Sequence, residues 1–216
     1  MTPAPHKSSA VPMIRTLTVV SLLCGLLIVV TDVNTRARIR HNRETIMQES
    51  VAQLLPGVHK QVIYDVEPSG EIKVAEGLQG DAKKIFAGYD DAGRFTGLVM
   101  EASDRGYADV ISALYAYDPE KKIITGFKVV DMRETPGLGS KIQTDPEFLS
   151  NFNALDGSGE HPIAAVKHGT KKNAWEIDAI SGATISSRAV GRALDASVKQ
   201  MGPIVARNLE RIRKGQ

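Results

Sequence analysis

The chain has 216 residues, of which 42% are hydrophobic and 24% charged, a composition typical of a globular protein with a hydrophobic core. Its formal net charge is +2, and the basic residues are spread along the chain, which argues against a nucleic-acid-binding surface. The single cysteine, Cys24, excludes an intrachain disulfide and a cysteine-based metal site.

An uncharged apolar segment lies near the N-terminus. It runs from Thr16 to Thr31 between Arg15 and Asp32. Extended at both ends, it reaches the roughly 20 residues that a helix needs to cross the hydrocarbon of a bilayer. A cleaved secretory signal is the competing interpretation, but no small-residue cleavage site follows the segment. We therefore expect a retained transmembrane helix.

The segment at 35–55 combines arginines with apolar residues near helical spacing, and Pro56-Gly57 is expected to end the helix. We interpret it as a solvated or headgroup-facing stalk. The expected organisation is a tail at 1–12, a transmembrane helix at 13–33, a helical stalk at 34–57 and a folded domain at 58–216.

The arginines of the stalk also bear on orientation. Two basic residues precede the apolar segment, whereas Arg36, Arg38, Arg40 and Arg43 follow it. Cytoplasmic flanks usually carry the excess of Lys and Arg. By this count alone, the folded domain would lie on the cytoplasmic side of the membrane.

Two segments beyond the stalk resemble each other. Residues 89–98 and 117–127 each contain an aromatic residue followed by Asp, a polar turn and a Thr-Gly pair. Each is typical of a β-hairpin, and the arms of the second run over 110–117 and 123–130. We expect neighbouring hairpins of one antiparallel sheet, with chance similarity as the alternative.

The last segment, from Ile185 to Ile212, is predicted to be helical. Val190, Leu194 and Val198 recur at four-residue spacing, which places them on one face, and Gly202-Pro203 is expected to interrupt the helix. Strands followed by a packing helix predict an α+β fold, with an antiparallel sheet built from hairpins packed with helices.

Two segments have compositions that do not suit core packing. In the first, residues 133–141, two glycines and a proline surround Leu138 after an apolar strand. Such a loop lets backbone amides approach a flat ligand, although a plain turn is the simpler interpretation. The second, residues 178–187, places small residues and free N–H groups at a helix start, where an anion can bind. Ordinary helix capping by Ser, Thr or Asp is the simpler interpretation there.

Taken together, the two segments resemble a known family. Glu-Thr-Pro-Gly-Leu-Gly at 134–139, followed by Asp-x-x-Ser-Gly-Ala-Thr at 178–184 after one membrane helix, resembles the FMN-binding G subunit of the Rnf electron-transport complex. The C subunit of the Na⁺-translocating NADH:quinone reductase is the near relative. The resemblance implies FMN joined through its phosphate to the hydroxyl of Thr184, and a flavin transferase that uses FAD as donor.

The expected site has no catalytic residue and no metal. The histidines show no metal-ligand spacing. Lys141 or Arg133 is expected to favour reduced, anionic flavin. The predicted cofactor-binding residues are Thr184, Ser181, Gly182, Ala183, Asp178, Ser186, Glu134, Thr135, Gly137, Leu138, Gly139 and Lys141.

The resemblance also implies a function. The chain is expected to relay electrons through FMN inside a multisubunit complex of the bacterial inner membrane that couples ferredoxin–NAD electron transfer to ion movement. Its expected partners are the other subunits, the transferase and the lipid bilayer, with no nucleic acid. The family places the domain in the periplasm, against the arginine count. The alternatives are a membrane-tethered assembly or sensory subunit without a redox role, and the equivalent quinone-reductase subunit.

Overall fold

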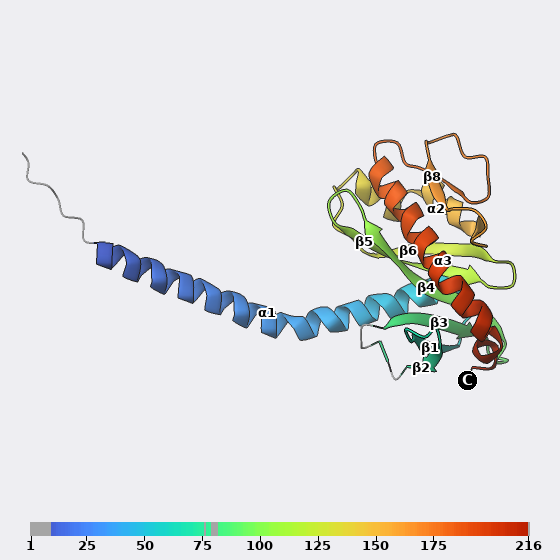
Figure 1. The fold of residues 1–216 in the computed structure, drawn as a ribbon, viewed down its shortest axis with the longest axis horizontal. Coiled ribbons are helices and arrows are strands. Elements are labelled where there is room, and N and C mark those ends of the chain that lie inside the picture. Colours follow the sequence, from blue (N-terminus) through green and yellow to red (C-terminus); the bar gives the residue numbers. More distant parts are fainter. Residues whose placement is uncertain (1–9, 76, 79–81, 216) are drawn as a thin grey trace, which may run out of the picture. The chain divides into compact units, whose positions relative to one another are not determined.

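A computed structural model describes residues 10–75, 77–78 and 82–215. The chain divides into two compact units, Met1–Thr45 and Ile46–Gln216. Figure 1 shows their elements, and each unit is described here by itself. Most of the expected N-terminal tail, residues 1–9, lies outside the described residues.

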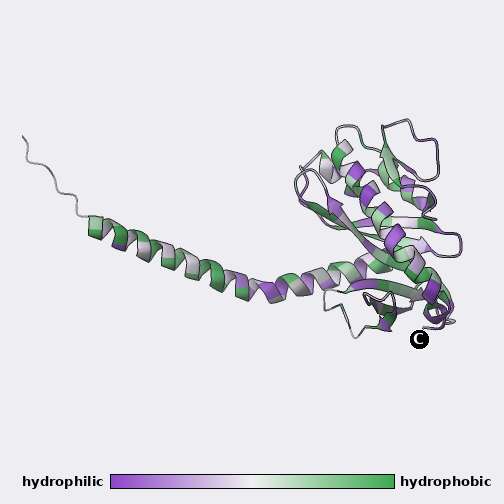
Figure 2. Ribbon diagram, viewed as in Figure 1, coloured by the Kyte–Doolittle hydropathy of each residue, from purple (hydrophilic) through white to green (hydrophobic). Residues whose placement is uncertain are grey.

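The first unit contains most of helix α1, which runs from Ala10 to Leu54. Its stretch Ala10–Arg36 has a mean hydropathy of 2.3 and is exposed throughout. Figure 2 shows this stretch as predominantly hydrophobic and the following turns as more hydrophilic. A helix of this length and composition can cross a bilayer.

The second unit is built on a seven-stranded antiparallel sheet. The strands in spatial order are β2 (Ile72–Val74), β1 (Lys60–Val66), β3 (Lys83–Tyr89), β4 (Phe95–Arg105), β5 (Val110–Asp118), β6 (Ile123–Asp131) and β7 (Leu155–Asp156). A parallel pair, β8 (Ala164–Val166) and β9 (Glu176–Asp178), forms a second small sheet. The remaining helices are the 3₁₀ turns η1 (Gly139–Gln143) and η2 (Asn151–Asn153), with α2 (Pro146–Ser150) between them and α3 (Thr184–Lys214) at the end. The predicted α+β fold is confirmed.

Both predicted hairpins are present, and they are neighbours. Strands β3 and β4 pair around the turn after Tyr89, β5 and β6 pair around the turn after Asp118, and β4 pairs with β5. The first turn is held by Asp90, whose carboxylate accepts hydrogen bonds from the backbone N–H groups of Ala92 and Arg94.

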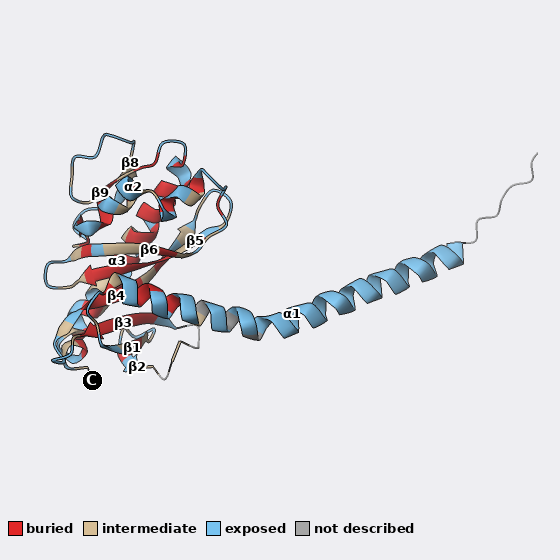
Figure 3. Cartoon of the chain, turned by 180° about the vertical axis from the view of Figure 1, so that it is seen from behind, coloured by how far each residue is buried: buried red, intermediate tan, exposed pale blue. Residues whose placement is uncertain are grey.

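The central strands are buried on both faces of the sheet, because α3 covers one face and the end of α1 covers the other (Figure 3). On β3 and β4, Ile85 and Leu98 belong to the core that includes α3, whereas the adjacent Phe86 and Val99 pack with Met47 from the end of α1. Successive side chains of a strand point to opposite faces of the sheet, so a continuous run of apolar residues contributes to both hydrophobic cores.

The repeated Thr-Gly pair of the two hairpins has a common structural cause. A Cβ at Gly97 would stand 3.1 Å from Leu55, and a Cβ at Gly126 would stand 3.0 Å from Leu54. Both glycines therefore lie close to the end of α1 and leave room for its leucines. This shared contact accounts for the glycine that recurs in the two hairpins.

The predicted interruption at Gly202-Pro203 is wrong, because α3 continues through Pro203. Proline removes one helical hydrogen bond and costs about 3 kcal/mol in a helix interior. Here Pro203 and Lys199, whose carbonyl loses its partner, lie at the exposed surface. Met201 and Val205 are buried on the other face, and burial of such side chains contributes about 1.5–3 kcal/mol each. Packing therefore offsets the cost of the proline.

A tyrosine–serine contact joins α3 to the sheet. The hydroxyl groups of Tyr115 and Ser197 are 2.9 Å apart, and Ser197 donates to the carbonyl of Glu101. Complete burial raises the pKa of Tyr115, because the phenolate would be desolvated.

The burial of Tyr115 predicts a loss of stability at alkaline pH. The stabilisation that goes with the raised pKa is complete at pH values below the pKa of tyrosine in the unfolded chain, about 10. It is lost as the pH rises toward the pKa of Tyr115 in the folded protein. The midpoint of guanidinium unfolding should therefore fall above about pH 10. Tyr115→Phe should make that fall shallower, because the phenylalanine ring has no proton to lose. If the unfolding midpoints of the wild-type protein and of Tyr115→Phe fell equally with pH above about pH 10, the prediction would be contradicted.

Candidate functional site

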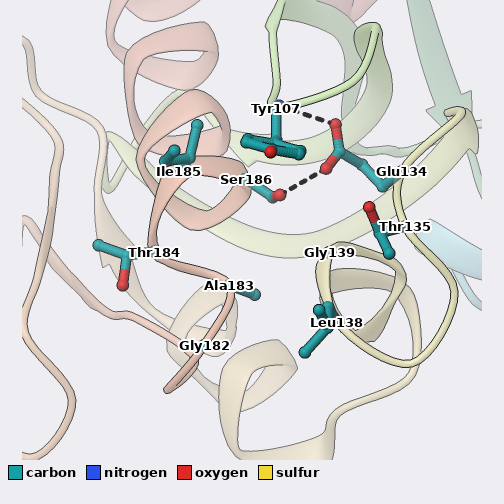
Figure 4. Close-up of a pocket in the computed structure, with 10 residues that line it drawn as sticks. All are labelled: Tyr107, Glu134, Thr135, Leu138, Gly139, Gly182, Ala183, Thr184, Ile185 and Ser186. Carbon is teal, nitrogen blue, oxygen red and sulfur yellow. Dashed lines mark hydrogen bonds between the residues drawn. The ribbon is translucent and has the colours of Figure 1, made fainter.

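The two segments singled out from the sequence meet in the structure. The loop after β6 and the first turn of α3 line one cavity of about 490 Å³, together with a residue of the turn between β4 and β5 (Figure 4). The lining residues are Glu134, Thr135, Leu138 and Gly139 from the loop, Gly182, Ala183, Thr184, Ile185 and Ser186 from the helix start, and Tyr107 from the turn.

Glu134 connects all three parts of this cavity. Its Oε1 accepts hydrogen bonds from the backbone N–H groups of Tyr107 at 2.9 Å and Ala108 at 3.1 Å. Its Oε2 accepts one from the hydroxyl of Ser186 at 2.7 Å, and both Glu134 and Ser186 are buried. Hydrogen bonds to a charged acceptor are stronger than neutral ones. The carboxylate therefore holds the loop, the turn and the helix start together.

Two glycines leave the space that this carboxylate occupies. A Cβ at Gly139 would stand 2.4 Å from Glu134 Oε2 and 2.7 Å from Ser186 Oγ, and a Cβ at Gly106 would stand 2.3 Å from Glu134 Oε1. These separations are too short for any side chain. The backbone must approach the carboxylate this closely, which explains glycine at both positions.

We expect Gly139→Ala to destabilise the second unit by about 1–3 kcal/mol, as for other overpacked sites, because neither Glu134 nor Ser186 can move without losing hydrogen bonds. Guanidinium unfolding of the full chain in detergent, followed by the fluorescence of Trp175, measures this change. The matched control is Gly202→Ala in α3, where nothing lies within 4 Å of the added Cβ. It should gain about 0.5–1 kcal/mol from the better helix propensity of alanine. Equal stabilities of the two variants would contradict the close contact of Gly139 with Glu134 and Ser186 as the cause.

The start of α3 is shaped without a side-chain cap. Ala183 is the residue before the helix and Gly182 has a φ of +84°, in the region that favours glycine. Ser187 supports the turn, because its hydroxyl donates to the carbonyl of Ala183 and accepts from the N–H of Ile180. The simpler interpretation of this segment as a capping motif is therefore wrong.

Thr184 is exposed at the first residue of α3. Among the described residues, no hydrogen bond uses its hydroxyl group, and in Figure 4 its side chain points away from Glu134. The hydroxyl is thus accessible to a reactant from solvent. The first N–H groups of a helix and its dipole favour a negatively charged group at this end.

Not every predicted site residue faces this cavity. Lys141, Asp178 and Ser181 line a neighbouring cavity of about 200 Å³ instead. Asp178 accepts a hydrogen bond from the N–H of Gly169 at 2.7 Å and pairs with His168 at 3.4 Å, so it anchors the loop between β8 and β9.

Gly137 is not among the residues that line either cavity. Its φ is +75°, and its N–H donates to the hydroxyl of Ser140 at 2.9 Å, which shapes the loop. Its contribution is therefore to the path of the backbone.

Two lining residues were missed by the sequence reasoning. Tyr107 is 67% exposed in the turn between β4 and β5, and Ile185 is 51% exposed in the first turn of the amphipathic helix α3. An aromatic side chain in a Gly-containing turn was the available signal for Tyr107. Trp175 lies outside the cavity lining, is half-buried and stacks on His161 with ring centres 3.9 Å apart.

Comparison with known proteins identifies the family. The model of the FMN-binding domain matches residues 106–199, which include every residue of the cavity. The G subunit of an ion-translocating oxidoreductase complex from Methanosarcina acetivorans is 33% identical over 186 residues, covering 86% of this chain and 90% of that protein. The G subunit of a proton-translocating ferredoxin:NAD(+) oxidoreductase complex from Clostridium ljungdahlii is 31% identical over 121 residues, covering 56% of this chain and 62% of that one.

A solved structure shares the fold. The crystal structure of NqrC from Shewanella oneidensis has a TM-score of 0.60 at 21% identity and covers 73% of this chain and 93% of its own. Given the match along nearly the whole Methanosarcina protein, this chain belongs to the family of G subunits of the Rnf-type ion-translocating oxidoreductase complexes and carries the FMN-binding domain of that family.

Proposed function

We propose that this subunit holds FMN through a phosphoester to Thr184 and relays electrons within a membrane complex that couples ferredoxin–NAD electron transfer to ion movement. The observation that carries the proposal is the cavity itself, which is lined both by an accessible threonine at a helix start and by the 134–139 loop. The FMN-binding domain model and the names of the relatives supply the cofactor and the reaction.

The residues present fit a flavin. A volume of about 490 Å³ is within the range of cofactor sites, which are mostly apolar with a few placed polar groups. Leu138, Ile185 and the ring of Tyr107 supply apolar surface for a flat ring system, and the helix start supplies N–H groups for a phosphodiester. Bound FMN would supply reversible electron uptake, and the protein would supply its position and its electrostatic environment.

Roles follow for the remaining predicted residues. Gly182 and Ala183 keep the approach to Thr184 clear, and Thr135, Leu138 and Gly139 lie on the side of the ring. Asp178, through Gly169 and His168, keeps the segment that carries Ser181 and Thr184 in place. These roles, like the domain limits at 13–33, 34–57 and 58–216, are predictions.

Attachment requires a separate enzyme in this proposal. A threonine hydroxyl is a weak nucleophile without a base. Glu134 is the acidic residue of the cavity, but its carboxylate already accepts three hydrogen bonds. A flavin transferase would join Thr184 Oγ1 to the FMN phosphorus of FAD, with AMP as the leaving group and release of the hydroxyl proton.

We further propose that α1 anchors the subunit in the bacterial inner membrane through the stretch Ala10–Arg36. The domain would lie in the periplasm, as the family resemblance implies. The arginines after the apolar stretch oppose this orientation, but few residues enter the count. Other subunits of the complex would donate and accept the electrons.

The decisive experiment is the intact mass of the protein purified from its own host, followed by peptide mapping. We expect the polypeptide mass plus FMN less one water, with the added mass on the peptide that contains Thr184. An unmodified polypeptide mass would contradict the proposal and support a tethered assembly or sensory subunit. Copurification with ferredoxin–NAD rather than quinone-reductase subunits separates the two complex types.

A further inference from the structure

The cavity contains one charged side chain among its ten lining residues, and that side chain is Glu134. Every hydrogen bond it makes is accepted from a donor: two backbone N–H groups and the hydroxyl of Ser186. Backbone N–H groups can only donate, and the serine hydroxyl donates here, so the partners at both oxygens suit a carboxylate, which accepts hydrogen bonds. The space assigned to the flavin is therefore bordered by a negative charge.

This charge has little freedom to move. Glu134 is 8% exposed, and the backbones of Gly106 and Gly139 close on its two oxygens. A rotation away from the cavity would break hydrogen bonds to two separate segments. The position of the charge is thus set by the fold rather than by a flexible side chain.

Nearby basic residues do not face the cavity with it. Arg133 is 81% exposed at its side chain and lies 3.9 Å from Asp109, and Lys141 lines the neighbouring cavity. The expectation that Lys141 or Arg133 favours reduced, anionic flavin therefore lacks support in their placement. The charged side chain that does line the cavity has the opposite sign.

We propose that Glu134 is the positioning residue of the cavity and that its fixed carboxylate lowers the reduction potential of the flavin bound there. The inference rests on the proposed function, since it concerns FMN held at Thr184. Two-electron reduction brings negative charge to the flavin unless protons accompany the electrons. A fixed negative charge nearby in a partly buried site opposes that change, which makes the flavin a stronger reductant.

The test compares two variants that disturb the same hydrogen bonds but change the charge differently. In Glu134→Gln the amide oxygen can still accept from the turn and the amide NH₂ can donate to the Ser186 hydroxyl, so the shape is kept while the charge is lost. In Ser186→Ala the carboxylate keeps its charge and loses one donor that disperses it. Both are made in the full chain with covalent flavin, and the flavin midpoint potential is measured by spectroelectrochemical titration.

Opposite shifts are expected. Glu134→Gln should raise the equilibrium constant for two-electron reduction on the order of tenfold, a shift of about +30 mV. Ser186→Ala should shift the potential in the negative direction. If Glu134 acts only by holding the segments together, both variants loosen the same contacts and their potentials shift the same way, which overturns the proposal. An unchanged potential in Glu134→Gln overturns it as well.

Two measurements separate this inference from the proposed function. The intact mass of wild-type protein reports whether FMN is attached at all, and its absence would remove the proposed function. A wild-type mass with FMN, together with a negative or absent shift in Glu134→Gln, would remove only the charge effect. Should Glu134→Gln fail to fold, Ser186→Ala decides alone, because a positive or absent shift in that variant contradicts the inference.

Discussion

A Thr184→Val variant is expected to carry no covalently bound flavin when it is purified from cells that contain the transferase. Valine has nearly the shape of threonine and lacks only the hydroxyl that the phosphoester requires. Thr184 is exposed, and its hydroxyl makes no hydrogen bond to the described residues, so stability should change by no more than about 0.5 kcal/mol. Flavin fluorescence on a denaturing gel should disappear completely, because the gel removes any flavin that is not covalently attached.

The matched control is Thr135→Val in the opposite wall of the same cavity. It removes an identical hydroxyl from an exposed residue and leaves Thr184 intact. Covalent fluorescence should persist in this variant. Fluorescence in Thr184→Val, or its loss in Thr135→Val alone, would show that another residue carries the phosphoester.

The largest loss of stability is expected from Phe152→Ala. Phe152 is fully buried, stacks on Phe127 of β6 with ring centres 4.3 Å apart and meets Phe148 edge-on at 5.3 Å. Deleting a buried phenylalanine ring costs about 3–5 kcal/mol through lost burial and the cavity left behind. The three rings hold the segment 146–153 against the sheet, and this segment lies shortly after the loop that lines the cavity. Guanidinium unfolding of the full chain in detergent measures the loss.

Leu138→Ala serves as the comparison for that variant. Leu138 also follows β6, but it is 51% exposed at the cavity, and its truncation should change stability by no more than about 0.5 kcal/mol. The absorption of bound flavin should respond instead, because apolar surface beside the proposed ring is removed. Equal losses of stability in the two variants would contradict the role of the aromatic cluster.

Local sequence patterns predicted the secondary structure well where residues close in sequence also contact each other in the fold. The two hairpins, their pairing and the amphipathic face of α3 all depend on contacts of this kind. The interruption at Pro203 was predicted wrongly because a local rule assigns the cost of proline without the burial of Met201 and Val205 that offsets it. The meaning of the Thr-Gly pairs was equally out of reach, since it depends on Leu54 and Leu55 far earlier in the chain.

The candidate site divides in the same way. Its two motifs could be found from residue order, because a helix start with small residues and a Gly-Pro loop are local features. The sequence marks Tyr107 only as an aromatic residue in a Gly-containing turn, and its place at the cavity depends on how the turn between β4 and β5 packs. Asp178 and Lys141 belong to recognisable segments, yet the structure turns both toward the neighbouring cavity.

By itself, the sequence determined an apolar helix long enough to cross a membrane, the sheet built from hairpins, and a threonine at the start of the last helix. Only the tertiary structure decided which charge faces the cavity. Arg133, Glu134 and Lys141 are close in sequence, but Glu134 alone meets the N–H groups of the 107–108 turn and the hydroxyl of Ser186. Glu134 can take this position because the backbones of Gly106 and Gly139 approach its carboxylate closely. Electrostatic effects follow distance in space, and these distances are set by packing between segments that the sequence keeps far apart.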